Sequence, residues 1–169
     1  MRDPQPAAGS QPAGNLLGID LGERRIGLAI AEHDGYTARP LATINRARSL
    51  APADDARTLA RFVAEQRIVE LVVGLPLDAN GEEGAMARAT ASWAHAVAER
   101  LGLPVTLRDE RLSSHLAEGR LGPMPRGRSG GPPSPTQRDR YRERVDREAA
   151  AIILQDELEA RRGAGPGRG

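Results

Sequence analysis

The chain of 169 residues contains no cysteine and no lysine, and it has only one phenylalanine, one tryptophan and two tyrosines. Without cysteine it can form neither disulfide bonds nor thiolate metal sites. With so few aromatic rings, aliphatic side chains must pack the core, and base stacking cannot be the main way of holding a single-stranded nucleic acid. All 24 basic residues are arginine, which we attribute mostly to coding bias.

The sequence also has little net charge, +1, and no long apolar run. A balanced charge does not by itself indicate a polyanionic partner. No segment approaches the roughly 18 apolar residues of a membrane span, and residues 1–14 lack the apolar core of a signal peptide. We therefore expect a soluble, cytoplasmic protein with one domain at 15–160, between disordered tails at 1–14 and 161–169.

The order of apolar patterns predicts an α/β fold. Alternating or continuous apolar runs indicate strands, and apolar residues at helical spacing indicate helices. The segment 122–137 holds five prolines and four glycines, and we expect it to be a flexible loop. The order βββ-α-β-α-β-α-α predicts a five-stranded mixed sheet with helices on both faces. The predicted strands are 16–20, 25–31, 37–44, 68–75 and 104–110, and the predicted helices are 54–66, 84–101, 113–121 and 138–161.

Three acidic residues stand at the ends of these elements, where a carboxylate is costly to desolvate. Asp20 ends the first strand, and Glu110 follows the last one. Asp146 lies on the same stripe of its helix as Ala149 and Ala150, whose small side chains would let the helix approach the sheet closely. Ligands of such sheets bind at the carboxyl ends of the parallel strands. We therefore expect the three acids to converge at one sheet edge.

Each acid also has a purely structural explanation. Asp20 could cap the turn at Gly22, Glu110 could pair with a neighbouring arginine, and Asp146 could be an acid favoured at a helix N-terminus. Convergence of all three favours a metal site instead, because carboxylate oxygens are the ligands of Mg²⁺ and Mn²⁺. Two such ions about 3.5–4 Å apart stabilise the attacking and leaving oxygens of a phosphodiester displacement. The expected cofactor is Mg²⁺ or Mn²⁺, as two ions.

Arginines gather around the Pro/Gly segment. Between residues 120 and 147 there are eight arginines and three acids, a local excess of +5. A basic segment beside a carboxylate cluster suits a phosphate backbone, which is bound with little sequence readout. The alternative is a solvated linker in an arginine-biased chain. The nucleic-acid-binding residues predicted in this region are Arg126, Arg128, Arg138, Arg142 and Arg144.

Four motifs in order carry a family resemblance: GIDLGERRIGLAI, VVGLPLDANG, DERLSS and RVDREAAAIIL. Through them the chain, from about Asn15 to Leu158, resembles the YqgF/RuvX family. These are small bacterial proteins with a ribonuclease H-like fold, related to the RuvC-type Holliday-junction resolvases. The resemblance implies an endonuclease that matures the 5′ end of precursor 16S rRNA during ribosome biogenesis. Resolution of Holliday junctions in DNA recombination and repair is the alternative activity.

The resemblance also implies roles for individual residues. Asp20, Glu110 and Asp146 would be the catalytic acids and would bind the metal, while Arg25 would face a phosphate. Asp109 would lie just outside the ligand set.

Some residues concern the shape of the site or depart from the family pattern. Gly22 and Gly27 would permit close backbone approach. Arg144 stands where the family commonly has lysine. Arg147 replaces a small residue and places an unexpected cation beside Asp146.

Two other functions remain open from the sequence. The stretch GIDLGERRIG also resembles the first phosphate loop of actin-like ATPases and sugar kinases, but those enzymes are longer and no second phosphate loop is evident. A non-catalytic RNA-binding assembly factor would not need three clustered acids. We expect structured RNA as the partner, with branched DNA as the alternative, and a monomer or weak dimer, because no long apolar face is left over for a symmetric dimer.

Overall fold

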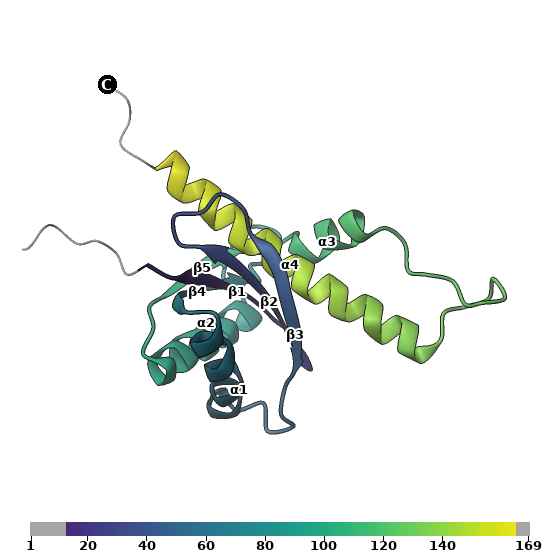
Figure 1. Ribbon diagram of the computed structural model, residues 1–169, viewed down its shortest axis with the longest axis horizontal. Helices are drawn as coiled ribbons and strands as arrows, with labels where there is room; N and C mark the ends of the chain where they lie inside the picture. The colour runs from purple at the N-terminus through teal and green to yellow at the C-terminus, as the bar shows by residue number, and fades with distance from the viewer. Residues whose placement is uncertain (1–12, 165–169) are drawn as a thin grey trace, which may run out of the picture.

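A computed structural model describes residues 13–164 of the chain. Its five-stranded sheet has the order β3-β2-β1-β4-β5 (Figure 1). The first three strands are antiparallel neighbours, whereas β4 runs parallel to β1 and β5 parallel to β4. The predicted mixed α/β sheet is thereby confirmed. The elements are β1 (Asn15–Leu21), β2 (Arg25–Glu32), β3 (Arg39–Asn45), α1 (Pro52–Glu65), β4 (Ile68–Leu75), α2 (Ala85–Leu101), β5 (Val105–Asp109), α3 (Ser113–Leu121) and α4 (Pro135–Gly163).

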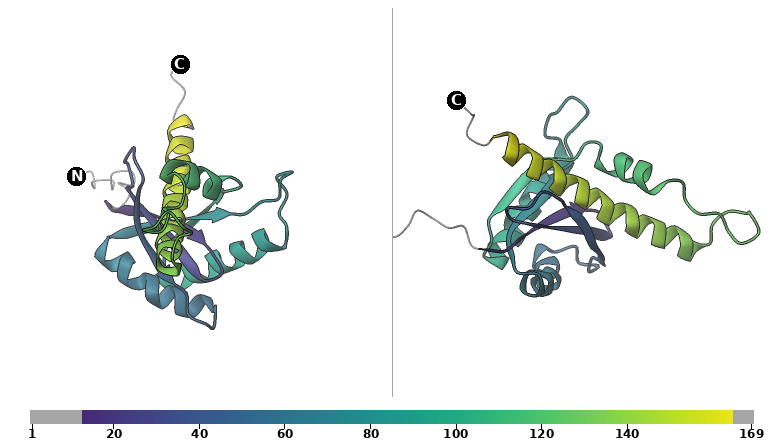
Figure 2. Two further views of the ribbon diagram at one scale, coloured as in Figure 1. Left: turned by 90° about the vertical axis from the view of Figure 1, so that its right-hand side faces the viewer. Right: turned by 45° about the horizontal axis from the view of Figure 1, so that its top comes forward.

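Helices cover both faces of the sheet, as predicted (Figures 1 and 2). Successive strand residues point to opposite faces, so Leu17 packs in the cluster under α1 and α2, and its neighbour Leu16 packs in the cluster under α4. Trp93 of α2 belongs to the first cluster, and Leu154 of α4 belongs to the second. Within residues 13–164, no helix has the length and apolar character needed to span a membrane.

Helix α4 crosses β1 and β2 so closely that two glycines are required there. A Cβ atom on Gly18 would lie 2.8 Å from Cβ of Leu154 and 2.9 Å from the carbonyl oxygen of Ala150. A Cβ atom on Gly27 would overlap the backbone carbonyl of Asp146. The close approach expected at Gly27 is therefore present, and it places Asp146 directly against β2.

The chain between β5 and the middle of α4 forms a projecting arm, which we define as residues 113–147 (Figures 1 and 2). The arm has a small core of its own, in which Ala117 packs with Tyr141 and Val145. The Tyr141 hydroxyl donates a 2.7 Å hydrogen bond to the carbonyl oxygen of Gly122. The arm is thus held by packing near the sheet and by a specific hydrogen bond farther out.

The predicted loop 122–137 is shorter than expected, because α4 begins at Pro135. Ser134 caps the helix: its hydroxyl accepts from the Gln137 N–H at 3.2 Å, and Gln137 Oε1 accepts from the Ser134 N–H at 2.8 Å. This reciprocal capping box, with proline at the first helical position, is a strong helix start. The prediction that 135–137 belong to a loop is wrong for this reason.

The far end of α4 also differs from the prediction. The helix continues to Gly163, so 161–163 are helical and do not belong to a tail. Arg161 fixes this last turn by donating to Glu70 on β4 and to Glu157 one turn earlier. The other predicted element boundaries lie within two residues of those observed. The remaining tail residues, 1–12 and 165–169, lie outside the described part of the chain.

Candidate active site

Two of the predicted acids meet at the carboxyl edge of the parallel strands. Asp20 lies near the end of β1, opposite Gly27 of β2. Glu110 follows β5, and its backbone N–H donates a 3.1 Å hydrogen bond to the carbonyl oxygen of Leu75 at the end of β4. Because β4 lies between β1 and β5, the ends of these strands converge. The side chains of Asp20 and Glu110 lie close enough that the negative charge of Asp20 raises the pKa of Glu110.

The surroundings of this pair favour uncharged carboxyl groups. Burial raises the pKa of Asp20 to about 6, the hydrogen bond from Glu110 lowers it, and the charge of Asp146 raises it. Burial likewise raises the pKa of Glu110 to about 9, and the negative charge of Asp20 adds to this effect. These shifts favour a pair that holds one proton between its two carboxyl groups near neutral pH.

One oxygen of Glu110 has no partner. Within residues 13–164, its Oε2 atom is buried and receives no hydrogen bond. The oxygen lies against Gly74 of β4, where a Cβ atom would overlap it. A buried acceptor without a partner costs about 1–3 kcal/mol. The absence of a side chain at Gly74 thus makes room for a carboxylate oxygen that the protein itself does not satisfy.

Asp146 is the third acid, and α4 brings it to the same edge. Its Oδ2 atom accepts a 2.6 Å hydrogen bond from Nε of Arg25, the first residue of β2. The charge of Asp146 raises the pKa of Asp20, so the two carboxyl groups are close enough to interact. The cation that contacts Asp146 is Arg25 and not its neighbour Arg147. The structure therefore pairs Asp20 with Glu110 and places Asp146 within range of the charge of Asp20, with its carboxylate held by Arg25.

The donor set fits a hard divalent cation. Across residues 13–164, no three Asp, Glu or His side chains stand as a completed set of metal ligands. Asp20 and Glu110 nevertheless face each other, one oxygen is unsatisfied, and Asp146 lies beside them. Carboxylate oxygens alone are the ligands of Mg²⁺ and Mn²⁺. A cation would displace a proton from the Asp20–Glu110 pair, whereas Asp146 has a second oxygen, Oδ1, beside the Oδ2 that Arg25 holds.

A cavity of about 430 Å³ opens beside Asp146, between the turn that joins β1 to β2 and helix α4. Three arginines line it, Arg24, Arg25 and Arg142. Arg142 and Arg25 were expected to bind nucleic acid, and here they share one cavity. Arg24 was not expected there, although it stands next to Arg25 in the GERR turn and the repeated arginine was a usable signal. Three acids line it as well, Glu23, Asp139 and Asp146, so its formal charges balance, and the cavity is wide enough for a phosphate.

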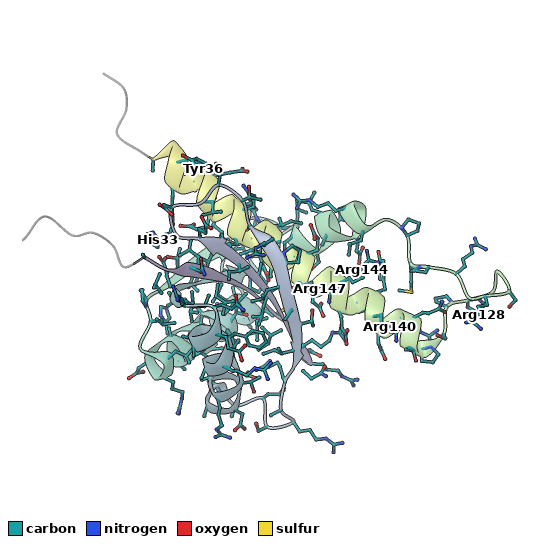
Figure 3. All side chains as sticks on the ribbon, viewed as in Figure 1. His33, Tyr36, Arg128, Arg140, Arg144 and Arg147 are labelled. Atoms are coloured by element: carbon teal, nitrogen blue, oxygen red, sulfur yellow. The ribbon has the colours of Figure 1, made fainter. Side chains whose placement is uncertain are left out.

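The other predicted arginines are distributed along the arm. Arg126 and Arg128 are exposed in its loop, and Arg144 is exposed on α4. Figure 3 shows Arg128 near the far end of the arm and Arg144 along the helix. Arg138 differs, because it is half-buried and its Nη1 atom donates a 3.0 Å hydrogen bond to the carbonyl oxygen of Pro133. Its guanidinium therefore ties the start of α4 to the loop before it.

Comparisons with known proteins agree with this arrangement. A family model described as RuvX, Holliday junction resolvase, matches residues 14–160. A relative from Chloroflexus aggregans is 42% identical over 147 residues, which are 87% of this chain and 94% of the relative. One from Anaeromyxobacter sp. strain Fw109-5 is 43% identical over 145 residues, 86% of this chain and 96% of the relative. Both are named as candidate pre-16S rRNA nucleases.

One solved structure shares the fold. Thermus thermophilus RuvC in complex with a Holliday junction substrate superposes with a TM-score of 0.50 at 17% identity, covering 89% of this chain and 97% of that one. Similarity at this level of identity concerns the fold alone. It confirms the predicted ribonuclease H-like fold.

Proposed function

The chain belongs to the RuvX family, and on that basis we propose that it is a metal-dependent endonuclease that hydrolyses phosphodiester bonds in precursor 16S rRNA during maturation of the 5′ end. The names of relatives that align over most of their length support this substrate. Such an enzyme would work in the cytoplasm, where bacterial ribosomes are assembled. We further propose that it acts as a monomer or weak dimer.

The observation that carries the proposal is the cluster of Asp20, Glu110 and Asp146. Two of these carboxyl groups have strongly raised pKa values, and one buried oxygen has no partner. Crowding like charges in a buried place destabilises a fold unless something binds there. Perturbed acids at a sheet edge are typical of functional sites. A divalent cation would relieve both the repulsion and the missing contact.

The residues of the chain have separable roles in this reaction. Oxygens of Asp20, Glu110 and Asp146 would hold Mg²⁺ or Mn²⁺, as one ion or two. When bound, the metal supplies a water of lowered pKa and offsets negative charge at the phosphate. Arg25 lines the 430 Å³ cavity beside Asp146, so its guanidinium can turn from the carboxylate to a backbone phosphate and orient the strand. The protein thus works mainly by positioning.

The arm supports a polyanionic substrate of some length. Its exposed arginines extend away from the acids along α4 and into the loop (Figure 3). Contacts of this kind neutralise phosphates and carry little sequence information. They suit structured RNA, recognised by its shape and backbone. Branched DNA has the same backbone chemistry, and the description of the family model keeps it as the alternative substrate.

The test is cleavage of two labelled substrates, a precursor 16S rRNA fragment and a synthetic four-way DNA junction. Each is incubated with Mg²⁺, with Mn²⁺ and with chelator, beside the variants Asp20→Asn and Glu118→Gln. Glu118 is an exposed acid on α3, away from the cluster, and serves as the matched control. We expect metal-dependent cleavage of the RNA that Asp20→Asn abolishes and Glu118→Gln preserves. Cleavage of the junction alone would move the activity to branched DNA, and full activity of Asp20→Asn would refute the proposed site.

A further inference from the structure

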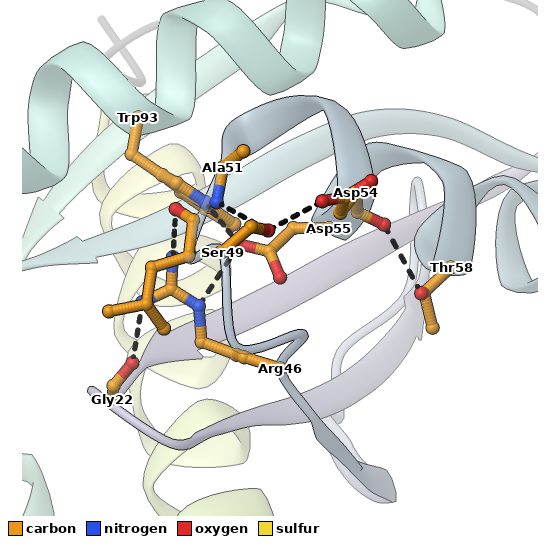
Figure 4. Close-up of polar contacts among 9 residues, drawn as sticks. Gly22, Arg46, Ser49, Ala51, Asp54, Asp55, Thr58 and Trp93 are labelled. Atoms are coloured by element: carbon orange, nitrogen blue, oxygen red, sulfur yellow. Dashed lines mark hydrogen bonds and ion pairs between the residues drawn. The ribbon is translucent and has the colours of Figure 1, made fainter.

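A buried ion pair between Arg46 and Asp55 lies on the α1–α2 side of the sheet, outside the acidic cluster, and contacts the turn that follows Asp20. The Arg46 side chain is 8% exposed and that of Asp55 is 2% exposed. Nε and Nη2 of Arg46 donate to the same oxygen of Asp55, at 3.0 and 2.8 Å (Figure 4). Nε1 of Trp93 donates to that oxygen as well, at 2.8 Å. The pair therefore joins the chain after β3 to both helices on this face of the sheet.

The remaining donors of Arg46 reach backbone carbonyls. Nη1 donates to Gly22 at 3.0 Å, and Nη2 donates to Leu50 at 3.1 Å. The backbone N–H of Arg46 donates to the carbonyl oxygen of Arg24 at 2.9 Å. Arg46 thus makes two hydrogen bonds to the turn between β1 and β2, one from its side chain and one from its main chain. Figure 4 shows the guanidinium between Gly22 and Asp55.

This turn connects two parts of the candidate site. Asp20 precedes Gly22 by two residues, and Arg25 follows it by three. The Gly22 N–H donates to the carbonyl oxygen of Arg25 at 2.9 Å, which closes the turn. Gly22 has no side chain, and its N–H is already bonded within the turn. Its carbonyl oxygen is therefore the group through which the rest of the protein can fix the turn. Arg46 holds that group.

We infer that Arg46 is a positioning residue for the acidic cluster. It fixes the Gly22 turn against α1 and thereby sets where Asp20 presents its carboxylate and where Arg25 presents its guanidinium. The effect of Arg46 on catalysis rests on the proposed function. Its effect on cation binding is measured separately. A charge buried as deeply as Arg46 usually adds little net stability over an apolar residue. The planar guanidinium of Arg46 instead binds a carboxylate and two carbonyl oxygens at once, and this fixes the relative positions of the three groups.

A second ion-pair network supplies the matched control. Arg161 of α4 bridges Glu70 and Glu157, and its side chain is 31% exposed. Glu70 lies near the start of β4, at the opposite end of that strand from the acidic cluster. Arg161 therefore stabilises the fold by the same chemistry without touching the turn. A purely structural role for Arg46 would make the two arginines behave alike.

The experiment compares Arg46→Lys with Arg161→Lys and wild type. Lysine keeps the positive charge beside Asp55 but has a single ammonium group that cannot span Asp55, Gly22 and Leu50 together. We expect Arg46→Lys to weaken Mn²⁺ binding about fivefold by calorimetry on the metal alone and to lower kcat for RNA about tenfold or more, since misplacement of a reacting group is costly. KM for RNA should change less than kcat. Arg161→Lys should stay within about twofold of wild type in all three.

The outcomes separate this inference from the proposed function. Thermal unfolding of every variant shows whether it is folded at the assay temperature, and Asp55→Asn, which keeps an oxygen for Arg46 and Trp93, should show the same pattern more weakly. If wild type binds Mn²⁺ but cleaves neither RNA nor DNA, the proposed function fails while the calorimetry still decides the role of Arg46. Unchanged Mn²⁺ binding in folded Arg46→Lys, or an equal loss in Arg161→Lys, would overturn the inference.

Discussion

Arg25 donates from Nε to Oδ2 of Asp146 over 2.6 Å, although the two residues are 121 positions apart in the chain. The pair joins β2 to α4 at the edge where Asp20 and Glu110 meet. A divalent cation bound to this carboxylate would repel the guanidinium beside it, so the two compete for the same negative charge. Arg25 and a divalent cation therefore compete for Asp146, and a substrate phosphate is an alternative partner of Arg25.

The first prediction concerns this exchange. Arg25→Ala leaves the Asp146 carboxylate free, so we expect Mn²⁺ to bind about threefold more tightly by calorimetry, in line with the modest net value of a partly exposed ion pair. KM for RNA should rise, because the contact to a phosphate is lost. Arg24→Ala is the control, since Arg24 lines the same cavity and is exposed. It should raise KM without changing Mn²⁺ binding. Weaker metal binding by Arg25→Ala would contradict this exchange.

The second prediction follows from the raised pKa values of Asp20 and Glu110. An acid whose pKa is higher in the folded state binds protons on folding, so stability falls as pH rises past its unfolded value. For this pair the loss begins near the ordinary values of 3.8 and 4.5 and continues to about 6 for Asp20 and about 9 for Glu110. The neutral amide of Glu110→Gln has no such cost. We expect this variant to unfold at a higher temperature than wild type at pH 8 and to match it more closely at pH 5.

Thermal unfolding between pH 5 and pH 9 measures this difference, with Glu118→Gln as the control that should follow wild type. Glu110→Gln should raise the free energy of unfolding at pH 8 by on the order of 1–2 kcal/mol. A change of one pKa unit corresponds to about 1.4 kcal/mol, and the variant removes the repulsion between the two carboxylates. Saturating Mg²⁺ should make the stability of wild type depend less on pH, because a bound cation takes the place of the proton that the two carboxyl groups share. A wild-type stability that rises from pH 5 to pH 9 relative to Glu110→Gln would show that the Glu110 carboxyl is not held protonated.

Much of the fold and the acidic cluster could be predicted from the sequence, because local patterns carry them. The run that leads to Asp20 is apolar, as a buried strand should be, and Glu110 follows another short strand. Parallel strands place their carboxyl ends at one edge, so two acids at strand ends must meet there. Asp146 was found through its helical stripe, since Ala150 and other small residues marked the face that packs on the sheet.

Features made by long-range side-chain contacts could not be predicted. Arg46 and Trp93 are far apart in the sequence, and nothing in their neighbourhoods signals that both contact Asp55. Arg161 was assigned to the tail because glycine and proline follow it in the sequence. Its ion pairs with Glu70 and Glu157, which extend the helix, leave no signal in that local pattern. The start of α4 was missed for another reason: the prolines around Ser134 suggested a loop, although proline at the first helical position continues into a helix.

The third prediction tests the arm as a phosphate-binding surface. The triple variant Arg126→Ala, Arg128→Ala, Arg144→Ala removes three exposed cations without touching the small core under α4. We expect the dependence of log K for RNA on log salt to become shallower by about 2, since each lost phosphate contact accounts for roughly 0.7–0.9 of the slope. Binding measured by fluorescence anisotropy at several salt concentrations gives this slope.

A matched triple variant on the far face controls for net charge. Exposed arginines of α1 and α2 lie on the side of the sheet away from α4, and the control replaces Arg57, Arg61 and Arg100 with alanine. It removes the same formal charge and should leave the slope nearly unchanged. An equal change in both triple variants would mean that total charge, and not the arm, attracts the RNA.

The fourth prediction concerns the glycine under Asp146. In Gly27→Ala the new methyl group would overlap the Asp146 carbonyl, so α4 must move away from β2. We expect a loss of about 1–3 kcal/mol in the free energy of unfolding, typical of overpacking, measured by denaturant titration. The same displacement carries the Asp146 carboxylate away from Asp20. Folded Gly27→Ala should therefore also bind Mn²⁺ more weakly.

Variants of two further glycines distinguish a loss of stability from a displacement of Asp146. Gly18→Ala also crowds α4, but its methyl group would meet Ala150 and Leu154, one turn or more beyond Asp146. It should destabilise the fold to a similar degree and weaken Mn²⁺ binding less. Gly119→Ala on α3 meets nothing within 4 Å and should stabilise slightly, by about 0.4–1 kcal/mol. If Gly18→Ala weakened metal binding as much as Gly27→Ala, the cluster would depend on the general seating of α4 and not on the contact at Gly27.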